Sequence, residues 1–431
     1  MKFNIGGLEH VPEKWKPVFR KGYATEQQSA AHPDSVESGC ALGRWALPLM
    51  AAGLCFALSA AAQARDVNEL MLKSVGTTEN VSPVIAEAIK HAAMDLTPEQ
   101  RKLALECWKN NVCETGHGNL TVAYADGFGE NVWRQVTKME FILQALTYPS
   151  IKKIIYTSAT GDATKAVSDM RAYIAQKVDV IVIFADAGPA LLPTVKEATE
   201  AGILVVLHNG TYVGGKPGKD FVTSIAEDLC ALGTEFVNKV VENSSKDPTT
   251  IVELGGTPGN GLSAGWQKCA EQEIAKHKNL KLLGKADTNW TQEGSFKAMS
   301  GFLAQHGSVD AVLFEYADGF RGGLRAYEAA KKAPDLIVSL RTDEMGVICD
   351  WEKANDPNFK IFYSNGQNDQ ARFALTAAMM KKEGKDVPSN INVPFKMHPV
   401  VKGQCNAAIP ESASLTTLVD NDMMKEMFAK Q

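Results

Sequence analysis

Short apolar runs alternate with longer segments of helical period from residue 119 to residue 383. The runs are short and rich in β-branched side chains, which is typical of strands buried in parallel sheets. The predicted strands are Leu120–Ala125, Ile151–Tyr156, Val178–Phe184, Ile203–Leu207, Thr250–Leu254, Leu282–Lys285, Ala311–Phe314, Leu336–Leu340 and Lys360–Tyr363. The predicted helices are Asn131–Leu146, Ala163–Gln176, Pro193–Ala201, Leu229–Glu242, Leu262–Lys276, Glu293–Gln305, Gly319–Lys331, Val347–Ala354 and Gln370–Glu383. This order predicts an α/β fold of doubly wound parallel sheets.

The strands are too many for one compact sheet, and an internal sequence similarity favours two sheets. Val178–Val182 followed by Ala185–Gly188 resembles Val309–Leu313 followed by Ala317–Gly319. The distance along the chain between the two copies is about that of one domain, so the sequence predicts two similar Rossmann-like lobes. The alternative is chance likeness between two buried strands.

Residues 65–118 precede the first predicted strand and have the pattern of a helical extension. Thr97-Pro98-Glu99-Gln100 combines a cap residue, a proline for the first helical position and an acid for the positive helix end. We assign no chemistry to this segment.

The segment 1–64 has the features of a leader. Trp45–Ala62 is an uncharged apolar stretch that follows Arg44, and it leads into the small-residue motif that ends at Ala64. This pattern predicts a secretory signal peptide that is cleaved after Ala64 and exports the protein. A membrane anchor is the alternative, but Pro48 and Gly53 are unfavourable in so short a span.

Six cysteines follow the leader, an even number that indicates disulfides in an oxidising compartment. Cys107 and Cys113 are predicted to pair, because they close a short loop after a helix. The other two pairs follow only by elimination, namely Cys230 with Cys269 and Cys349 with Cys405. The six cysteines are Cys107, Cys113, Cys230, Cys269, Cys349 and Cys405.

Charge and composition exclude several classes of function. The chain has 45 Lys and Arg against 50 Asp and Glu, without long blocks of one sign, so a nucleic-acid partner is not expected. No Cys and His cluster has metal-ligand spacing, and the glycines near residue 256 fit neither a P-loop nor G-x-G-x-x-G. We therefore predict no metal site and no cofactor.

Several motifs together resemble one family. They are Val178–Phe184, Ala201–Val206, Gly255–Asn260, and Val309–Phe314 running into Ala317–Gly319. From Asn119 to Met397 the chain resembles the ribose/galactose type of periplasmic binding protein, also called type I, which feeds ABC importers. The resemblance implies two lobes joined by a multi-strand hinge, with ligand held in a cleft at the carboxyl ends of the strands.

Under this resemblance the leader (1–64) and extension (65–118) precede a first lobe of 119–222 plus 366–393 and a second lobe of 223–365 plus 394–431. The protein is expected to be a monomer that binds a sugar or polyol without catalysis. It would deliver this ligand to the transmembrane subunits of an ABC permease. A receptor that presents its ligand to a membrane sensor is the alternative, and no residue separates the two.

The first ligand loop is predicted to supply Asp126, Phe128, Asn131, Trp133 and Arg134. Asn131-Val132-Trp133-Arg134 resembles the Asn-x-Trp-Arg form of this loop in the family. Trp133 would stack on one face of a sugar ring, although a helical tryptophan is more commonly part of the core. Trp290, in Asp287-Thr288-Asn289-Trp290, would cover the other face.

Other predicted ligand positions depart from the family. His208-Asn209 replaces the usual Asp-Arg pair, and Ala317-Asp318 replaces Asn-Asp. Asp343 matches a late ligand residue of the family, and Asn365 stands where a Gln is common. Because charged groups are missing, we expect a less charged and more aromatic cleft that does not prefer free ribose or galactose. If His208 contacts the ligand, affinity should depend on pH.

Gly261-Leu262-Ser263-Ala264-Gly265 fits the G-x-S-x-G motif of serine hydrolases, with Asp343 and His398 available downstream. The motif requires its serine on the strand-to-helix turn. Here a loop separates Ser263 from the strand, so a secreted hydrolase is the remote alternative.

Overall fold

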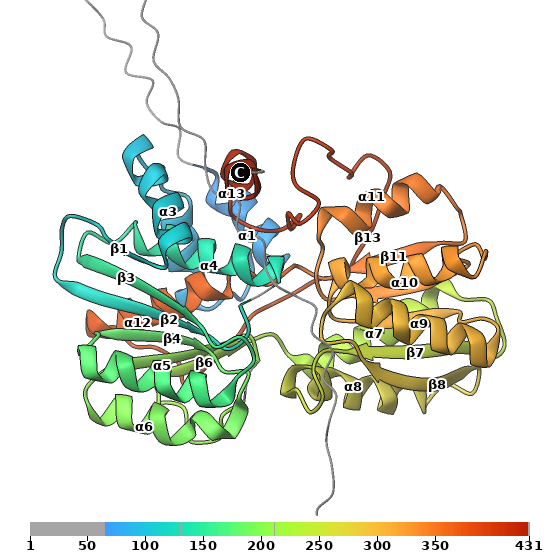
Figure 1. Cartoon of the computed structure of the whole chain (residues 1–431), viewed down its shortest axis with the longest axis horizontal. Coiled ribbons are helices and arrows are strands. Elements are labelled where there is room, and N and C mark those ends of the chain that lie inside the picture. Colours follow the sequence, from blue (N-terminus) through green and yellow to red (C-terminus); the bar gives the residue numbers. More distant parts are fainter. Residues whose placement is uncertain (1–64, 130, 211, 430–431) are drawn as a thin grey trace, which may run out of the picture. The chain divides into compact units, whose positions relative to one another are not determined.

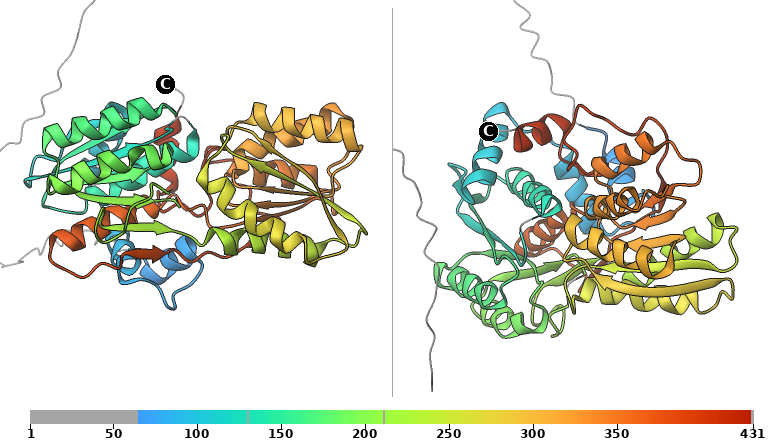
Figure 2. Two further views of the ribbon diagram at one scale, coloured as in Figure 1. Left: turned by 90° about the horizontal axis from the view of Figure 1, so that it is seen from below. Right: turned by 45° about the vertical axis from the view of Figure 1, so that its right-hand side comes forward.

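The computed structural model describes residues 65–129, 131–210 and 212–429 of the chain. They form two sheets, each with helices on both faces, as Figures 1 and 2 show. The predicted α/β fold with two lobes is thereby confirmed. The predicted leader, residues 1–64, lies outside the described residues.

The first sheet has seven strands in the order β1-β3-β2-β4-β5-β6-β12. These are β1 (Val112–Glu114), β2 (Leu120–Asp126), β3 (Ile151–Ser158), β4 (Val180–Phe184), β5 (Leu204–His208), β6 (Thr223–Ala226) and β12 (Asn390–Asn392). Neighbours run parallel except β1, which is antiparallel to β3 and lies in the segment expected to be helical. The sequence pattern missed β1, β6 and β12 because each is very short and partly exposed or half-buried.

The second sheet has six strands in the order β13-β11-β10-β9-β7-β8. These are β13 (His398–Pro399), β11 (Lys360–Tyr363), β10 (Ile337–Leu340), β9 (Ala311–Phe314), β7 (Thr249–Gly255) and β8 (Leu280–Asp287). Only β13, at one edge, is antiparallel to its neighbour. Both sheets are therefore mixed, with parallel strands in their centres.

Alternate residues of each strand pack against different helices, as the twofold period of a strand requires. In the first lobe, Ile181 and Ile183 pack with α5 (Ala163–Gln176) and α6 (Leu192–Glu200), which follows the short η1 (Gly188–Leu191). Val180 and Val182 belong to the opposite core, with α4 (Val132–Ala145) and α12 (Gln370–Lys382). In the second lobe, α7 (Leu229–Asn243) and α8 (Gly261–Ile274) cover one face, and α9 (Gln292–His306), α10 (Ala317–Ala329) and α11 (Met345–Ala354) cover the other.

Three connections run from one lobe to the other, as expected for a multi-strand hinge. They join β6 to α7, β11 to α12, and β12 to β13. The sequence predicts the first crossing after Val222, but Thr223–Ala226 pairs with β5 of the first sheet, so the crossing follows Ala226. The exact lobe boundaries otherwise stay a prediction.

Two segments outside this two-lobed unit pack on it. The extension forms α1 (Val67–Val75), α2 (Pro83–Ala92) and α3 (Pro98–Asn110). The helix α3 begins at the predicted cap Thr97, which forms a capping box with Gln100. The tail contacts both lobes before α13 (Asn421–Phe428). Ser414 and Thr416 donate to Asp343 of the second lobe, and Leu418 N–H donates to Glu140 of the first.

The three predicted cysteine pairs are confirmed as disulfides, Cys107–Cys113, Cys230–Cys269 and Cys349–Cys405.

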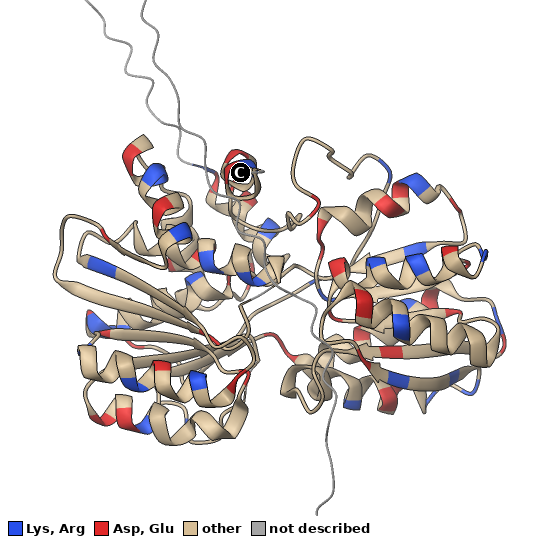
Figure 3. Ribbon diagram, in the orientation of Figure 1, with Lys and Arg blue, Asp and Glu red and all other residues tan. Residues whose placement is uncertain are grey.

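Figure 3 shows acidic and basic residues interspersed over the helices of each lobe. No helix among the described residues is sufficiently long and apolar to cross a membrane.

Candidate ligand-binding site

A small cavity of about 30 Å³ is lined by residues of both lobes; we call it the interlobe cavity. Its lining residues are Asn131, Trp133, Arg134 and Phe184 of the first lobe, and Leu262, Trp290, Glu315, Tyr316, Arg341 and Thr342 of the second. Most of them end a strand or follow one closely. The carboxyl ends of parallel strands form one edge of a sheet, which is the usual binding edge of α/β folds.

Two carboxylates hold Arg134 in the wall of this cavity. Its Nη1 donates to Asp126 Oδ1 and its Nη2 to Asp186 Oδ1, each at 2.8 Å. The guanidinium carbon lies 3.4 Å from the centroid of the Phe184 ring. Burial raises the pKa of Asp186 to about 6, although the Arg134 charge acts in the opposite direction. Because a guanidinium has five N–H groups, Arg134 is a fixed donor with further capacity for a ligand oxygen.

Arg341 connects the lobes on the opposite wall. It follows β10 of the second sheet and forms an ion pair with Glu227, which follows β6 of the first. Its Nη2 donates to Asn209 Oδ1 at 2.5 Å. Gln370 completes the network by donating to Glu227 Oε2 at 2.7 Å and accepting from Asn209 N–H at 2.8 Å. Burial raises the pKa of Glu227, but the charge and hydrogen bond of Arg341, together with hydrogen bonds from the backbone and Gln370, leave this pKa below its ordinary value.

Trp133 is positioned at the start of α4. Asn131 caps this helix by accepting from the backbone N–H of Arg134 at 3.0 Å. The Trp133 indole donates from Nε1 to the carbonyl oxygen of Gly366 at 2.7 Å. The guanidinium carbons of Arg134 and Arg341 each lie 5.8 Å from its ring centroid. The cavity therefore has an aromatic face between two cations.

Trp290 is anchored by a buried carboxylate. Its Nε1 donates to Glu315 Oε1 at 2.8 Å, and Ser263 Oγ donates to the same oxygen at 2.5 Å. Trp266 Nε1 donates to Glu315 Oε2. Burial raises the pKa of Glu315, and the three donors partly offset this effect. An aromatic plane from each lobe with fixed polar groups beside it suits a ring or chain with C–H faces and hydroxyl edges.

The predicted residues divide into those at the cavity and those apart from it. Asn131, Trp133, Arg134 and Trp290 line the interlobe cavity; Asp126, Phe128 and Asn209 contact lining residues. Phe128 meets Trp290 edge to face, with ring centroids 5.8 Å apart. His208 is fully buried behind Phe184, whose ring centroid lies 5.3 Å from its own.

Asp318, Asp343 and Asn365 are not among the residues that line this cavity. Asp318 accepts from Gln292 on the outer helices of the second lobe. Asp343 accepts from Ser414 and Thr416 and so holds the tail. Asn365 donates to the carbonyl oxygen of Lys73 and accepts from Lys396 N–H at the hinge. The polar groups of these three residues therefore form hydrogen bonds within the protein, with the outer helices, the tail, the extension and the hinge.

Sequence reasoning missed part of the lining, namely Phe184, Leu262, Glu315, Tyr316, Arg341 and Thr342. Glu315 and Arg341 directly follow predicted strands. This position, one residue after a strand, was the sequence signal that could have identified them as lining residues. The expectation of a less charged cleft does not hold for this cavity. Arg341 and Glu315 supply charge there in place of the missing Asp-Arg pair.

The hydrolase alternative is wrong. Ser263 is the third residue of α8, and its hydroxyl is bonded to Glu315 rather than to a histidine. Asp343 binds the tail, and His398 lies in β13 with its ring 5.6 Å from that of Tyr363. The three groups do not form a triad. Among the described residues, no cluster of three His, Cys, Asp or Glu side chains could hold a metal ion.

His208 should affect stability rather than ligand affinity. Burial, followed by the charges of Arg134 and Arg341, lowers its pKa to about 3, so it stays neutral in the fold while the unfolded chain takes up a proton near pH 6.5. Its contribution to stability is complete above about pH 6.5 and is lost at about 1.4 kcal/mol per pH unit as the pH falls toward 3.

We expect His208→Gln to remove the contribution of this histidine to the fall in unfolding free energy with pH. Urea denaturation at several pH values between about 6.5 and 3 measures this dependence. His117→Gln, at an exposed histidine, is the control and should leave the slope unchanged. An acid slope that is equal in His208→Gln and the wild type would contradict the prediction.

The chain matches the model of the periplasmic binding protein domain over residues 125–386. The xylitol-binding protein of Mycolicibacterium smegmatis is 23% identical over 197 residues, which are 45% of this chain and 55% of that protein. The galactofuranose-binding protein of Escherichia coli is 25% identical over 218 residues, 50% of this chain and 66% of that protein. The chain thus spans between half and two thirds of the length of these relatives.

Solved structures of similar fold include a galactofuranose-binding protein, with a TM-score of 0.59 and 19% identity over 65% of this chain and 94% of that one. Another is a solute-binding protein of an ABC transporter from Actinobacillus succinogenes with bound D-allose, with a TM-score of 0.57 and 18% identity over 67% of this chain and 99% of that one. About a third of this chain therefore has no counterpart in either structure.

Proposed function

Since this chain belongs to the periplasmic binding protein family, we propose that it captures a sugar or polyol in the interlobe cavity and delivers it to an ABC importer. Export by the predicted leader would place it in the periplasm. The observation that carries the proposal is that Trp133 and Trp290, from different lobes, line one cavity together with Arg134 and Arg341. Family members bind solutes and do not catalyse reactions, so no chemical step is required of these groups.

The ligand we favour is a single neutral unit, either a furanose or a short polyol. The cavity is small, which favours a single unit over a longer saccharide. Both arginines are paired with carboxylates, so the site offers an anion no net positive charge. Xylitol and galactofuranose appear in the names of two relatives. Free ribose and free galactose are not expected to bind most tightly, because the charges of this cavity come from Arg341 and Glu315 and not from the positions of the family's Asp-Arg pair, where His208-Asn209 stands.

A thermal-shift screen of residues 65–431 against furanoses, polyols, pyranoses, nucleosides and amino acids tests this proposal. A ligand present at a hundred times its Kd should add about 2.7 kcal/mol of stability. The proposal is wrong if no sugar or polyol shifts the melting temperature, and the ligand argument is wrong if ribose or galactose binds most tightly. Loss of uptake of the identified ligand on gene deletion would support an importer; retained uptake with a lost transcriptional response would support the alternative membrane sensor.

Replacing Trp133 or Trp290 with Ala should weaken binding of the identified ligand by about 1–3 kcal/mol, the usual contribution of an aromatic platform under a flat ring. Isothermal titration calorimetry measures the change. Trp351→Ala is the matched control, because this half-buried indole donates to Phe359 O and lies outside the cavity lining. Unchanged affinity in both Trp133→Ala and Trp290→Ala would rule out the site.

A further inference from the structure

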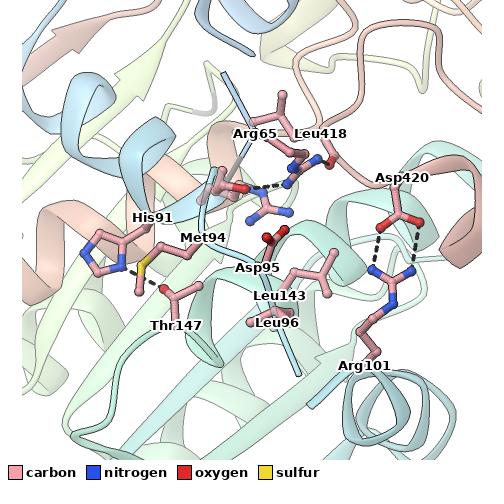
Figure 4. Close-up of a pocket in the computed structure, with 12 residues that line it drawn as sticks. Arg65, His91, Met94, Asp95, Leu96, Arg101, Leu143, Thr147, Leu418 and Asp420 are labelled. Carbon is pink, nitrogen blue, oxygen red and sulfur yellow. Dashed lines mark hydrogen bonds and ion pairs between the residues drawn. The ribbon is translucent and has the colours of Figure 1, made fainter. Parts of the chain in front are cut away.

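A second pocket lies where the extension, the first lobe and the tail meet (Figure 4). Its volume is about 100 Å³, and it shares no lining residue with the interlobe cavity. The extension contributes Arg65 and Arg101, α12 contributes Arg372, and the tail contributes Asp420. We call it the extension pocket. Because Arg65, Arg101 and Asp420 lie outside residues 125–386, it is not a feature of the matched family domain.

Three guanidinium groups line the extension pocket, and only one has a carboxylate partner among the lining residues. Arg101 donates to both oxygens of Asp420 at 2.7 and 2.9 Å, as Figure 4 shows. Among the residues that the structure describes, Arg65 donates only to backbone carbonyl oxygens, those of Ala92 and Leu418. A guanidinium satisfied by neutral carbonyls keeps its full charge available for an anion.

Arg372 has unused donor capacity at the same place. It is 2% exposed, its Nε is paired with Glu140, and its Nη1 donates to Gln144 at 3.0 Å. Its Nη2 is buried and has no hydrogen-bond partner among the described residues. A buried charged donor without a partner is costly, so this atom indicates a missing acceptor.

The like charges of Arg65 and Arg372 affect one another. Burial and then the charge of Arg372 lower the pKa of Arg65, although Glu140 and Asp420 act in the opposite direction. Asp95 is the other acid that lines the pocket, and it is exposed. An oxyanion would give Arg65 a charged partner and Arg372 Nη2 an acceptor. Two arginines are suited to binding an oxyanion, because the planar guanidinium group presents paired N–H donors that match the oxygens of a carboxylate or a phosphate.

We propose that the extension pocket binds a small anion that carries a carboxylate or a phosphate, independently of the ligand in the interlobe cavity. Arg65 and Arg372 hold the oxyanion. The Thr147 hydroxyl also lies in the lining, but it is already used, because it donates to Gln144 O and bonds with His91 Nδ1. The bound anion joins the extension to the first lobe, through Arg65 and Arg372. Its occupancy should therefore stabilise the folded protein without changing the selectivity of the interlobe cavity.

Calorimetric titration of residues 65–431 with inorganic phosphate and with succinate, at constant ionic strength set by sodium chloride, tests the proposal. We expect saturable binding of at least one probe. Arg65→Gln should weaken it about tenfold, because a charge-assisted contact is lost. Asp95→Asn should strengthen it about threefold, because a like charge leaves the pocket. Asp95 is exposed, so this variant is a test that does not depend on a buried substitution.

Trp290→Ala separates this proposal from the proposed function. It should weaken sugar or polyol binding and leave phosphate and succinate binding unchanged, whereas Arg65→Gln should do the opposite. Absence of saturable binding of both probes to the wild type would overturn the proposal. Equal affinities of wild type, Arg65→Gln and Asp95→Asn would overturn it as well, because binding would then be located elsewhere.

Discussion

Replacing Arg341 with Met should lower the free energy of unfolding by about 3–5 kcal/mol, because it leaves a buried carboxylate without its cation. Arg341 and Glu227 are both buried, at 3% exposure each, and the pair joins the two lobes beside the interlobe cavity. The substitution also removes the hydrogen bond from Arg341 to Asn209. Ligand affinity should fall as well, since Arg341 lines the cavity.

Urea denaturation measures this loss against two further variants. Arg171→Met breaks the exposed pair of Arg171 with Glu197 and should cost less than about 1 kcal/mol, as surface pairs generally do. Arg341→Met combined with Glu227→Leu should recover much of the lost stability, because the unpaired charge is gone. Equal losses in Arg341→Met and Arg171→Met would show that the interlobe pair does not hold the fold as described.

Gly256→Ala should reduce ligand affinity about a hundredfold, at least as much as removing an aromatic platform altogether. A Cβ atom at position 256 would lie 2.1 Å from Cε2 of Trp290, much closer than side-chain atoms approach. The indole must then leave its place against Glu315, and both the cavity wall and the bond from Trp290 Nε1 are lost. Overpacking of this kind should also cost about 1–3 kcal/mol of stability.

Gly261→Ala is the matched control for this substitution. Gly261 begins α8, at the end of the same loop, and a Cβ there meets no atom within 4 Å. Affinity is measured by calorimetry, and tryptophan fluorescence reports the displaced indole. If Gly256→Ala binds the ligand as tightly as Gly261→Ala does, Trp290 does not form a wall of the binding site.

The centres of both sheets were predictable because their strands are buried on both faces. Ala311–Phe314 and Lys360–Tyr363 are strands with the bounds predicted from their apolar runs. The edge strands were not predictable in the same way. Asn390–Asn392 has one buried residue between two exposed ones, and its pairing with β6 depends on a neighbour far away in the sequence.

The cavity lining was predictable where local sequence resembles a family motif. Trp133, Arg134 and Trp290 were identified in this way, and all three line the interlobe cavity. Glu315 and Arg341 were missed because the family motifs point to other loop positions and not to the residue directly after each strand. Asp343 was misplaced because its partner, the tail near Thr416, has no signal in the local sequence around the strand.

The order of strands in the first sheet has a consequence for how this chain folds. The edge strand β12 pairs with β6, although the whole second sheet except β13 lies between them in the sequence. The helix α12, which packs on β4, β5 and β6, is also formed from this late part of the chain. During synthesis the first lobe therefore remains incomplete until Asn392 has been added. Neither sheet is formed from one continuous stretch of the chain, and contacts between such distant segments slow folding.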